Sequence, residues 1–212
     1  MPRDNTSSTL VRNLVFINVI VFLFWNIQFG NSEIPQFMAE NFLVSWTGLL
    51  EGRYWILITS VFSHHQLWHL LMNMFVLYSF GRVVESVLGS QRFFKFYIFA
   101  GIISSLSHAV VSRYLLQEAS IPALGASGAI SGVILLFALM FPKEKLYILG
   151  ILPLPAIWGA IVFVGLDLWG LFSQFEGGGF PIGHGAHLGG ALTGLIYYFI
   201  LRQQNKNQRG LS

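Results

Sequence analysis

Apolar residues come in six long runs, which are separated by shorter segments rich in glycine, proline and charge. Runs of roughly 17 to 25 apolar residues are long enough for a helix to cross the hydrocarbon core of a bilayer. Pro153 and Pro155 interrupt the fifth run. The pattern predicts an all-α membrane protein, a bundle of six transmembrane helices over Asn13–Phe29, Leu67–Leu88, Phe93–Tyr114, Ser127–Phe141, Leu146–Phe172 and Gly183–Leu201.

The stretch between the first two runs, Gly30–Gln66, has a different character. It carries Trp46, Tyr54 and Trp55 together with three glutamates, so it is too polar to cross a bilayer and too aromatic for a plain linker. Tryptophan and tyrosine gather at the membrane–water interface. We therefore expect this first loop to be an interfacial segment that lies on the membrane.

The composition supports a membrane protein. The chain of 212 residues is 54% hydrophobic and 10% charged, whereas a soluble domain is about 25% charged. We expect one polytopic membrane domain over 1–212, with a core of about 52–201 and short polar tails. Its basic residues are dispersed, so a pI of about 9.3 indicates no nucleic-acid partner, and the lipid bilayer is the expected surrounding. The absence of cysteine excludes disulfides.

The lysines and arginines also predict an orientation. With six helices and the N-terminus inside, only Arg53 and Arg113 lie on the outer side. The inner side then carries Arg3, Arg12, Arg82, Arg92, Lys95, Lys143, Lys145, Arg202, Lys206 and Arg209. Cytoplasmic loops are enriched in such residues, so both termini are expected to be cytoplasmic. Because nothing resembles a transit peptide, the bacterial inner membrane is the expected location.

Polar groups stand at the start of three of the apolar runs. His69 and Asn73 are early in the second helix, Ser127 begins the fourth, and His187 lies one turn into the sixth. These helices all run from outside to inside in the predicted topology, so the groups fall at one depth near the outer face. The fourth run has fifteen residues and spans only about 22 Å, so we expect Ser127 to lie below the surface, beside a cavity. Polar groups in a membrane are costly and mark functional sites.

Ser127 is the candidate nucleophile, and its hydroxyl needs a base to remove its proton. The surrounding glycines, Gly128 and Gly132, also have the spacing of a helix-packing motif, which is the better interpretation of this segment taken alone. The two interpretations are compatible because close packing brings Ser127 to its base. That base is His187, on a small-residue face with Gly194, although a hydrogen-bonded structural histidine would fit the same pattern.

Other polar residues are weaker candidates. His184 lies on a different face from His187, and Asp167, placed near the far end of the fifth helix, is given a structural or gating role. His65 and His69 have the i, i+4 spacing of a metal site, but Gln66 stands where the zinc-protease motif needs glutamate. We therefore expect no metal. His69 and Asn73 share one helix face, as oxyanion donors would.

Four motifs occur together in one order along the chain. They are His69-x-x-x-Asn73, Gly81-x-x-x-Glu85-x-x-x-Gly89, Gly125-Ala126-Ser127-Gly128 and Ala186-His187-Leu188-Gly189-Gly190. With them the chain resembles a rhomboid intramembrane serine protease over roughly Gly52–Leu201. The segments Leu57–His64 and Ala186–Ala191 are similar to the subtype that includes the mitochondrial presenilin-associated rhomboids.

This resemblance implies a catalytic dyad of Ser127 and His187 with no acid. It also implies an oxyanion and substrate-binding region of His69, Asn73, Gly125 and Ala126, joined by the Ser127 backbone N–H. One departure concerns the first loop, where many bacterial rhomboids have Trp-Arg and this chain has Trp55-Ile56.

The predicted function is that of a serine endopeptidase without cofactor or metal. It would cleave transmembrane protein substrates in or next to their membrane segment, near the outer face. The alternative is a non-catalytic rhomboid-like protein that binds transmembrane helices, but such relatives lack the serine or the histidine and this chain keeps both. A transporter is disfavoured because the polar groups stop in one leaflet.

Overall fold

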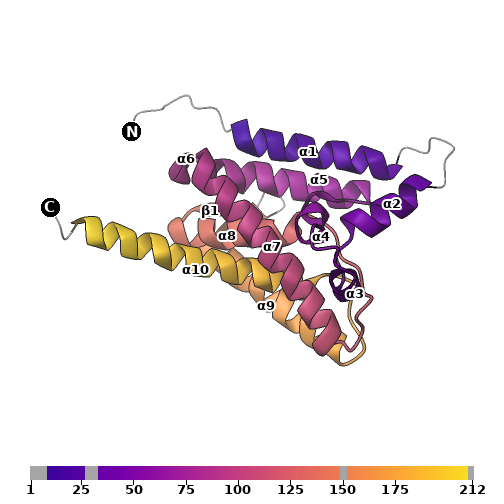
Figure 1. Ribbon diagram of the computed structural model, residues 1–212. Helices are drawn as coiled ribbons and strands as arrows, with labels where there is room; N and C mark the ends of the chain where they lie inside the picture. The colour runs from indigo at the N-terminus through magenta and orange to yellow at the C-terminus, as the bar shows by residue number, and fades with distance from the viewer. Residues whose placement is uncertain (1–8, 27–32, 149–151, 210–212) are drawn as a thin grey trace.

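The computed structural model describes residues 9–26, 33–148 and 152–209, which form a bundle of helices (Figure 1). The helices are α1 (Thr9–Asn26), α2 (Glu33–Phe42), α3 (Trp46–Leu50), α4 (Ile56–Thr59), α5 (Leu67–Val76), α6 (Arg82–Leu88), α7 (Ser90–Tyr114), α8 (Ser127–Met140), α9 (Ala156–Phe175) and α10 (His184–Arg209). A 3-10 turn, η1 (Ser60–Phe62), a π-helical turn, η2 (Leu77–Gly81), and two strands, β1 (Lys145–Ile148) and β2 (Leu152–Pro155), complete the described elements. The start of α1 and the end of α10 lie toward the same side of the bundle (Figure 1).

Four helices of the described chain are long and apolar enough to cross a membrane. They are α1, α7, α9 and the continuous rod of α5, η2 and α6, which has the predicted bounds Leu67–Leu88. The fourth predicted helix is the shorter apolar helix α8, and α10 carries His184 and His187 in its apolar half. The helical membrane class is thus confirmed, while the count of six crossings stays a prediction.

The fifth predicted helix lies within its apolar run, but the described residues at the start of the run, 146–148 and 152–155, are strands and not helix. There β1 and β2 pair antiparallel, with Leu146 opposite Leu154 and Tyr147 opposite Pro153. Proline has no N–H to give to a helix, and its ring clashes with the preceding turn. Two prolines spaced two apart therefore prevent a helix from starting earlier, and α9 begins at Ala156, directly after Pro155.

The first loop folds into α2, α3, α4 and η1, and it is tied to the segment before Ser127. Val44 and Ala123 form an antiparallel bridge, with N–H to carbonyl distances of 2.9 and 2.8 Å. Arg53 Nη1 donates to the Glu40 carbonyl at 2.9 Å, so an arginine anchors this loop despite the changed Trp-Arg position. Residues 27–32, which include the predicted start of the segment and the predicted end of the first helix, lie outside the described residues. The position of this loop on the membrane stays a prediction.

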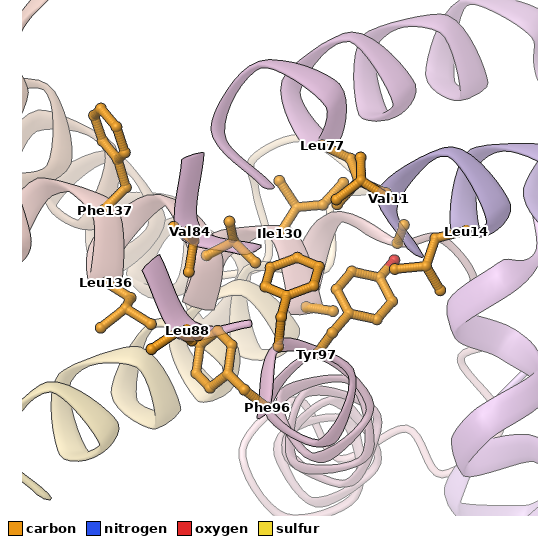
Figure 2. Packing of buried hydrophobic residues seen from close by; sticks show 14 of the residues in the cluster. Val11, Leu14, Leu77, Val84, Leu88, Phe96, Tyr97, Ile130, Leu136 and Phe137 are labelled. Atoms are coloured by element: carbon orange, nitrogen blue, oxygen red, sulfur yellow. The ribbon is translucent and has the colours of Figure 1, made fainter. Parts of the chain in front are cut away.

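The core lies where α1, α7, α8 and the α5–η2–α6 rod meet (Figure 2). Its largest fully buried side chains include Phe93 and Tyr97 of α7, Leu14 of α1, Leu77 of η2 and Leu136 of α8. The outer faces of α5 and α9 carry many exposed aromatic and aliphatic side chains. An apolar outer face is what a helix in contact with lipid requires, so the inside and outside of this bundle are both apolar.

Glu85 connects the start of α1 to the junction of α6 and α7. Its side chain is buried, and its two oxygens accept bonds from the N–H groups of Leu10 at 3.3 Å and Val11 at 3.1 Å. Its Oε1 also accepts from the Ser90 hydroxyl at 2.7 Å. A carboxylate at a helix N-terminus satisfies free N–H groups and interacts favourably with the helix dipole. Glu85 therefore has a structural role as a cap on the N-terminus of α1.

Candidate active site

Glycines let α8 and α10 approach until their backbones touch. A Cβ atom built on Gly190 would lie 1.8 Å from the carbonyl oxygen of Gly128, and one on Gly194 would lie 2.4 Å from that of Gly132. Such close contact is possible only where neither helix carries a side chain. The predicted packing role of Gly128 and Gly132 is confirmed, and this contact brings the first turns of the two helices together.

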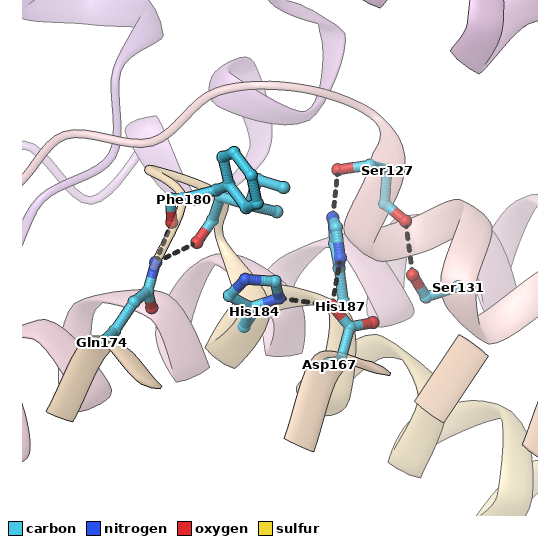
Figure 3. A network of polar contacts seen from close by, with 8 residues as sticks. Ser127, Ser131, Asp167, Gln174, Phe180, His184 and His187 are labelled. Atoms are coloured by element: carbon cyan, nitrogen blue, oxygen red, sulfur yellow. Dashed lines mark hydrogen bonds and ion pairs between the residues drawn. The ribbon is translucent and has the colours of Figure 1, made fainter. Parts of the chain in front are cut away.

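Ser127 and His187 meet at this end of the contact (Figure 3). Ser127 is the first residue of α8, and His187 lies in the first turn of α10. Ser127 Oγ lies 2.9 Å from His187 Nε2, within hydrogen-bond distance. A serine hydroxyl in direct contact with an imidazole nitrogen is the arrangement that lets the imidazole take its proton.

The other nitrogen of His187 contacts a carboxylate. His187 Nδ1 lies 2.9 Å from Asp167 Oδ1, and His184 Nδ1 lies 2.7 Å from the same oxygen (Figure 3). The expectation that Asp167 lies away from the site is wrong, while the Ser127–His187 dyad stays a prediction. α9 runs antiparallel to α8 and α10, so its later half lies beside their first turns. The far end of the fifth helix is thus the end nearest to Ser127.

His69, Asn73 and Gly125 line a cavity of about 1290 Å³ together with Ser127 and His187. His69 packs on Gly125, whose φ is +123°, and a Cβ at that glycine would lie 2.7 Å from the imidazole. Asn73 Nδ2 donates one hydrogen to the His69 carbonyl at 2.8 Å. The structure therefore places His69, Asn73 and Gly125 around the serine, as predicted.

Ala126 is buried and does not line the cavity. Its backbone N–H donates a long bond of 3.5 Å to Nε2 of His64, a fully buried side chain whose ring also contacts that of His69. His64 thus supports the turn that presents Ser127. Sequence reasoning missed this role because His64 stands in a polar loop beside the exposed His65, and no periodicity separates the two.

The described residues that could together hold a metal are Asp167, His184 and His187, whose ligand atoms lie within 4.8 Å of one another. The predicted alternative, His65 with His69, is not such a group. The Nδ1 atoms of His184 and His187 already contact Asp167, so a metal at this group would have to replace these two hydrogen bonds. The expectation of a metal-free site stays a prediction.

Fold and site together define a helical membrane protein with a partly buried serine–histidine pair at one end of its bundle. The family model described as Rhomboid domain matches residues 51–204. The chain is 31% identical to "RHOMBOID-like protein 12, mitochondrial" of Arabidopsis thaliana over 92% of its length, and 32% identical to "Rhomboid protein 1, mitochondrial" of Saccharomyces cerevisiae over 94%. It is 32% identical to "Presenilin-associated rhomboid-like protein A, mitochondrial" of Danio rerio over 88%. The chain belongs to the rhomboid family, and its resemblance to the presenilin-associated subtype is confirmed.

The same comparisons correct the expected location. The chain spans about half the length of the curated relatives that it matches, namely 59%, 55% and 46% of the three proteins above. These relatives are named as mitochondrial, so the expectation of a bacterial inner membrane is wrong. That expectation was based on the lack of a recognisable transit peptide, which carries no weight in a chain covering only part of its relatives.

Gly190→Ala should destabilise the protein, because the added Cβ would force α8 and α10 apart at the Gly128 carbonyl. Overfilling a tight contact typically costs about 1–3 kcal/mol. Thermal unfolding in detergent micelles measures the loss. Gly165→Ala on α9 is the matched control, since a Cβ there would meet nothing within 4 Å. Equal unfolding midpoints for the two variants would contradict the close contact.

His64 should make stability depend on pH. Burial, with a smaller effect of nearby His69, lowers the pKa of His64 from 6.5 to about 3 in the folded protein. Between these values the unfolded chain binds more protons, so stability falls as the pH drops below about 6.5, by up to about 1.4 kcal/mol per pH unit. His64→Gln should lower the slope of unfolding free energy against pH by up to about 1.4 kcal/mol per pH unit, as measured by unfolding from pH 7 to pH 5. An unchanged slope would show that His64 is hydrated in the folded state.

Proposed function

We propose that this rhomboid is an intramembrane serine endopeptidase that cleaves membrane-anchored proteins in or next to their transmembrane segments. The observation that carries the proposal is the 2.9 Å contact between Ser127 Oγ and His187 Nε2 at the wall of a cavity. A second histidine and a buried asparagine stand beside this pair. Membership of the rhomboid family supports the same chemistry.

The reaction follows from the roles of these two side chains. Ser127 Oγ forms a bond to the scissile carbonyl carbon while its proton passes to His187 Nε2, and the carbonyl oxygen becomes an oxyanion. Collapse of this intermediate breaks the C–N bond, and His187 returns the proton to the leaving amine. Water, deprotonated by the same imidazole, then hydrolyses the serine ester and restores the hydroxyl.

Donors for the oxyanion are available on two sides of Ser127. The first i to i−4 bond of α8 runs from the Ile130 N–H to the Ala126 carbonyl, so the Ser127 and Gly128 N–H groups have no such partner. An amide side chain carries two hydrogens, and Asn73 Nδ2 uses one on the His69 carbonyl. We assign the second hydrogen, the Ser127 N–H and the His69 ring to the oxyanion hole.

The cavity wall suggests how a substrate reaches the serine. It includes Trp68 and Met72 of α5 on one side and Phe180 and Ile182 of the loop after α9 on another. All four are exposed, although they border a polar site. We assign this apolar rim to the transmembrane segment of a protein substrate, whose extended end would enter the cavity. The mitochondrial relatives support a mitochondrial membrane as the setting.

Ser127→Ala should abolish proteolysis and labelling by a fluorophosphonate probe, because the probe reacts only with an activated hydroxyl. The experiment uses the detergent-solubilised chain and a panel of single-pass membrane proteins. Ser79→Ala is the matched control, since Ser79 is exposed and bonds only within its own helix. A chelator should leave wild-type labelling unchanged. Labelling that survives in Ser127→Ala would show that another residue is the nucleophile, and no labelling in wild type would favour the non-catalytic, helix-binding alternative.

Asn73→Ala should leave a slower protease. Loss of one oxyanion donor typically lowers kcat by about 10²–10³-fold, whereas loss of the base His187 should remove activity almost entirely. Steady-state kinetics on a cleaved substrate measures both. Asn26→Ala is the control, because Asn26 makes the same i to i−4 side-chain bond at 2.9 Å on α1, outside the cavity lining. Equal rates for the Asn73 and Asn26 variants would remove Asn73 from the oxyanion hole.

A further inference from the structure

Two buried side chains next to the Ser127–His187 pair have no part in the steps above. Asp167 and His184 are 5% and 7% exposed. Asp167 does not line the cavity, so it is not placed to touch a substrate. Burying an ionisable group is unfavourable unless it is hydrogen-bonded to partners that compensate. We therefore expect Asp167 and His184 to have a specific role at the site.

One face of α9 is shaped around the two histidines of α10. Phe163, Asp167 and Gly170 follow one another at helical spacing, so they share a face. Phe163 stacks on the His187 ring with 5.8 Å between centroids, and Asp167 Oδ1 contacts the Nδ1 atoms of His187 and His184. A Cβ on Gly170 would lie 2.3 Å from His184 Nε2, so this glycine leaves the space that the His184 ring fills.

The chemistry of the carboxylate decides where the protons are. An ionised carboxylate only accepts hydrogen bonds, so Nδ1 of His187 must carry a hydrogen and its Nε2 must be the free acceptor. That is the tautomer in which Nε2 can take the Ser127 proton. The opposite tautomer would present an N–H to the hydroxyl and could not act as base.

We propose that Asp167 is a positioning residue for His187 and that His184 in turn holds Asp167 in place. The inference rests on the proposed protease function, and it adds an acid to a site for which a serine–histidine dyad was expected. The proton that leaves Ser127 Oγ goes to His187 Nε2, while the Nδ1 hydrogen stays on His187. Asp167 remains ionised throughout and stabilises the imidazolium that forms.

His184 supplies the second bond to the same oxygen. Asp167 Oδ2 is buried and has no hydrogen-bond partner among the described residues, so the carboxylate is held through Oδ1 alone. With His184 packed on Gly170, the carboxylate cannot rotate away from His187 without losing this bond. His184 thus acts on the reaction only through Asp167.

The first test compares variants of Asp167 and His184 in the detergent-solubilised chain. Asp167→Asn should lower kcat by about 10²–10⁴-fold with KM unchanged. The amide can support the wrong histidine tautomer, as it does in serine proteases with a Ser-His-Asp triad. His184→Phe keeps the ring against Gly170 and removes the donor, so kcat should fall by about tenfold. The double variant should be no slower than Asp167→Asn alone.

A pair of glycines on α9 separates this role from general stability. Gly170→Ala should reproduce the effect of His184→Phe, because its Cβ would displace the His184 ring, whereas Gly165→Ala should leave kcat unchanged. The role of His184 would be overturned if the rate losses of Asp167→Asn and His184→Phe multiplied in the double variant. Equal rates for the two glycine variants would also overturn it. Loss of wild-type activity on chelation would also overturn the proposal, because the three side chains would then hold a metal.

Tautomer measurements keep the inference testable if the chain proves inactive. With ¹⁵N-histidine labelling, and His187 assigned by comparison with His187→Gln, the wild-type spectrum should show the Nδ1–H form of His187. Asp167→Asn should show a mixture of both forms. An inactive wild type with the Nδ1–H form would refute only the proposed protease function. An unchanged tautomer and unchanged labelling rate in Asp167→Asn would refute the positioning role.

Discussion

The backbone contact between α8 and α10 is the constraint on which the site depends. Ser127 and His187 are 60 residues apart in sequence, so only the packing of their helices can bring them together. Gly190 against the Gly128 carbonyl and Gly194 against that of Gly132 set how closely the two helices approach. In lipid, apolar side chains give little preference for one neighbour over another, so close packing of small residues decides which helices associate. The contact ends at Ser127, and the 2.9 Å distance between Ser127 Oγ and His187 Nε2 follows from it.

α9 is attached to this pair in a different way. Only 22% of its spanning window is buried, against 44% for α7, so apolar packing holds it less firmly. Its buried residues are two alanines near its start, and then Asp167 and Gly170, which both contact His184. The later half of α9 is therefore held largely through His184 and His187. Moving this half outward would separate Asp167 from His187, so the contact between these two side chains requires α9 to stay in place.

The sequence predicted the features that depend on local pattern. The rod Leu67–Leu88 has the predicted bounds, and the shared depth of Asn73, Ser127 and His187 placed them at one site, because both inferences need only helix length and direction. The β1–β2 pair and the contacts of Asp167 were missed for a tertiary reason. Apolar periodicity does not distinguish a short strand pair from the start of a helix, and it does not say which residues of antiparallel neighbours come opposite one another. His64 was missed since its burial depends on how the first loop folds back over the turn before Ser127.

An apolar layer lies beneath the site and bears on how the proposed hydrolysis would be compatible with a membrane barrier. Ser131 Oγ donates to the Ser127 carbonyl, and beyond it α8 buries Val133 and Leu136 completely. The Tyr97 hydroxyl, deeper in the core, has no hydrogen-bond partner among the described residues. The proposed hydrolysis needs water at Ser127, whereas a continuous polar path through the bundle would also conduct protons or ions. Val133 and Leu136 separate the cavity from the far end of α8, which fits the proposed enzyme better than a transporter.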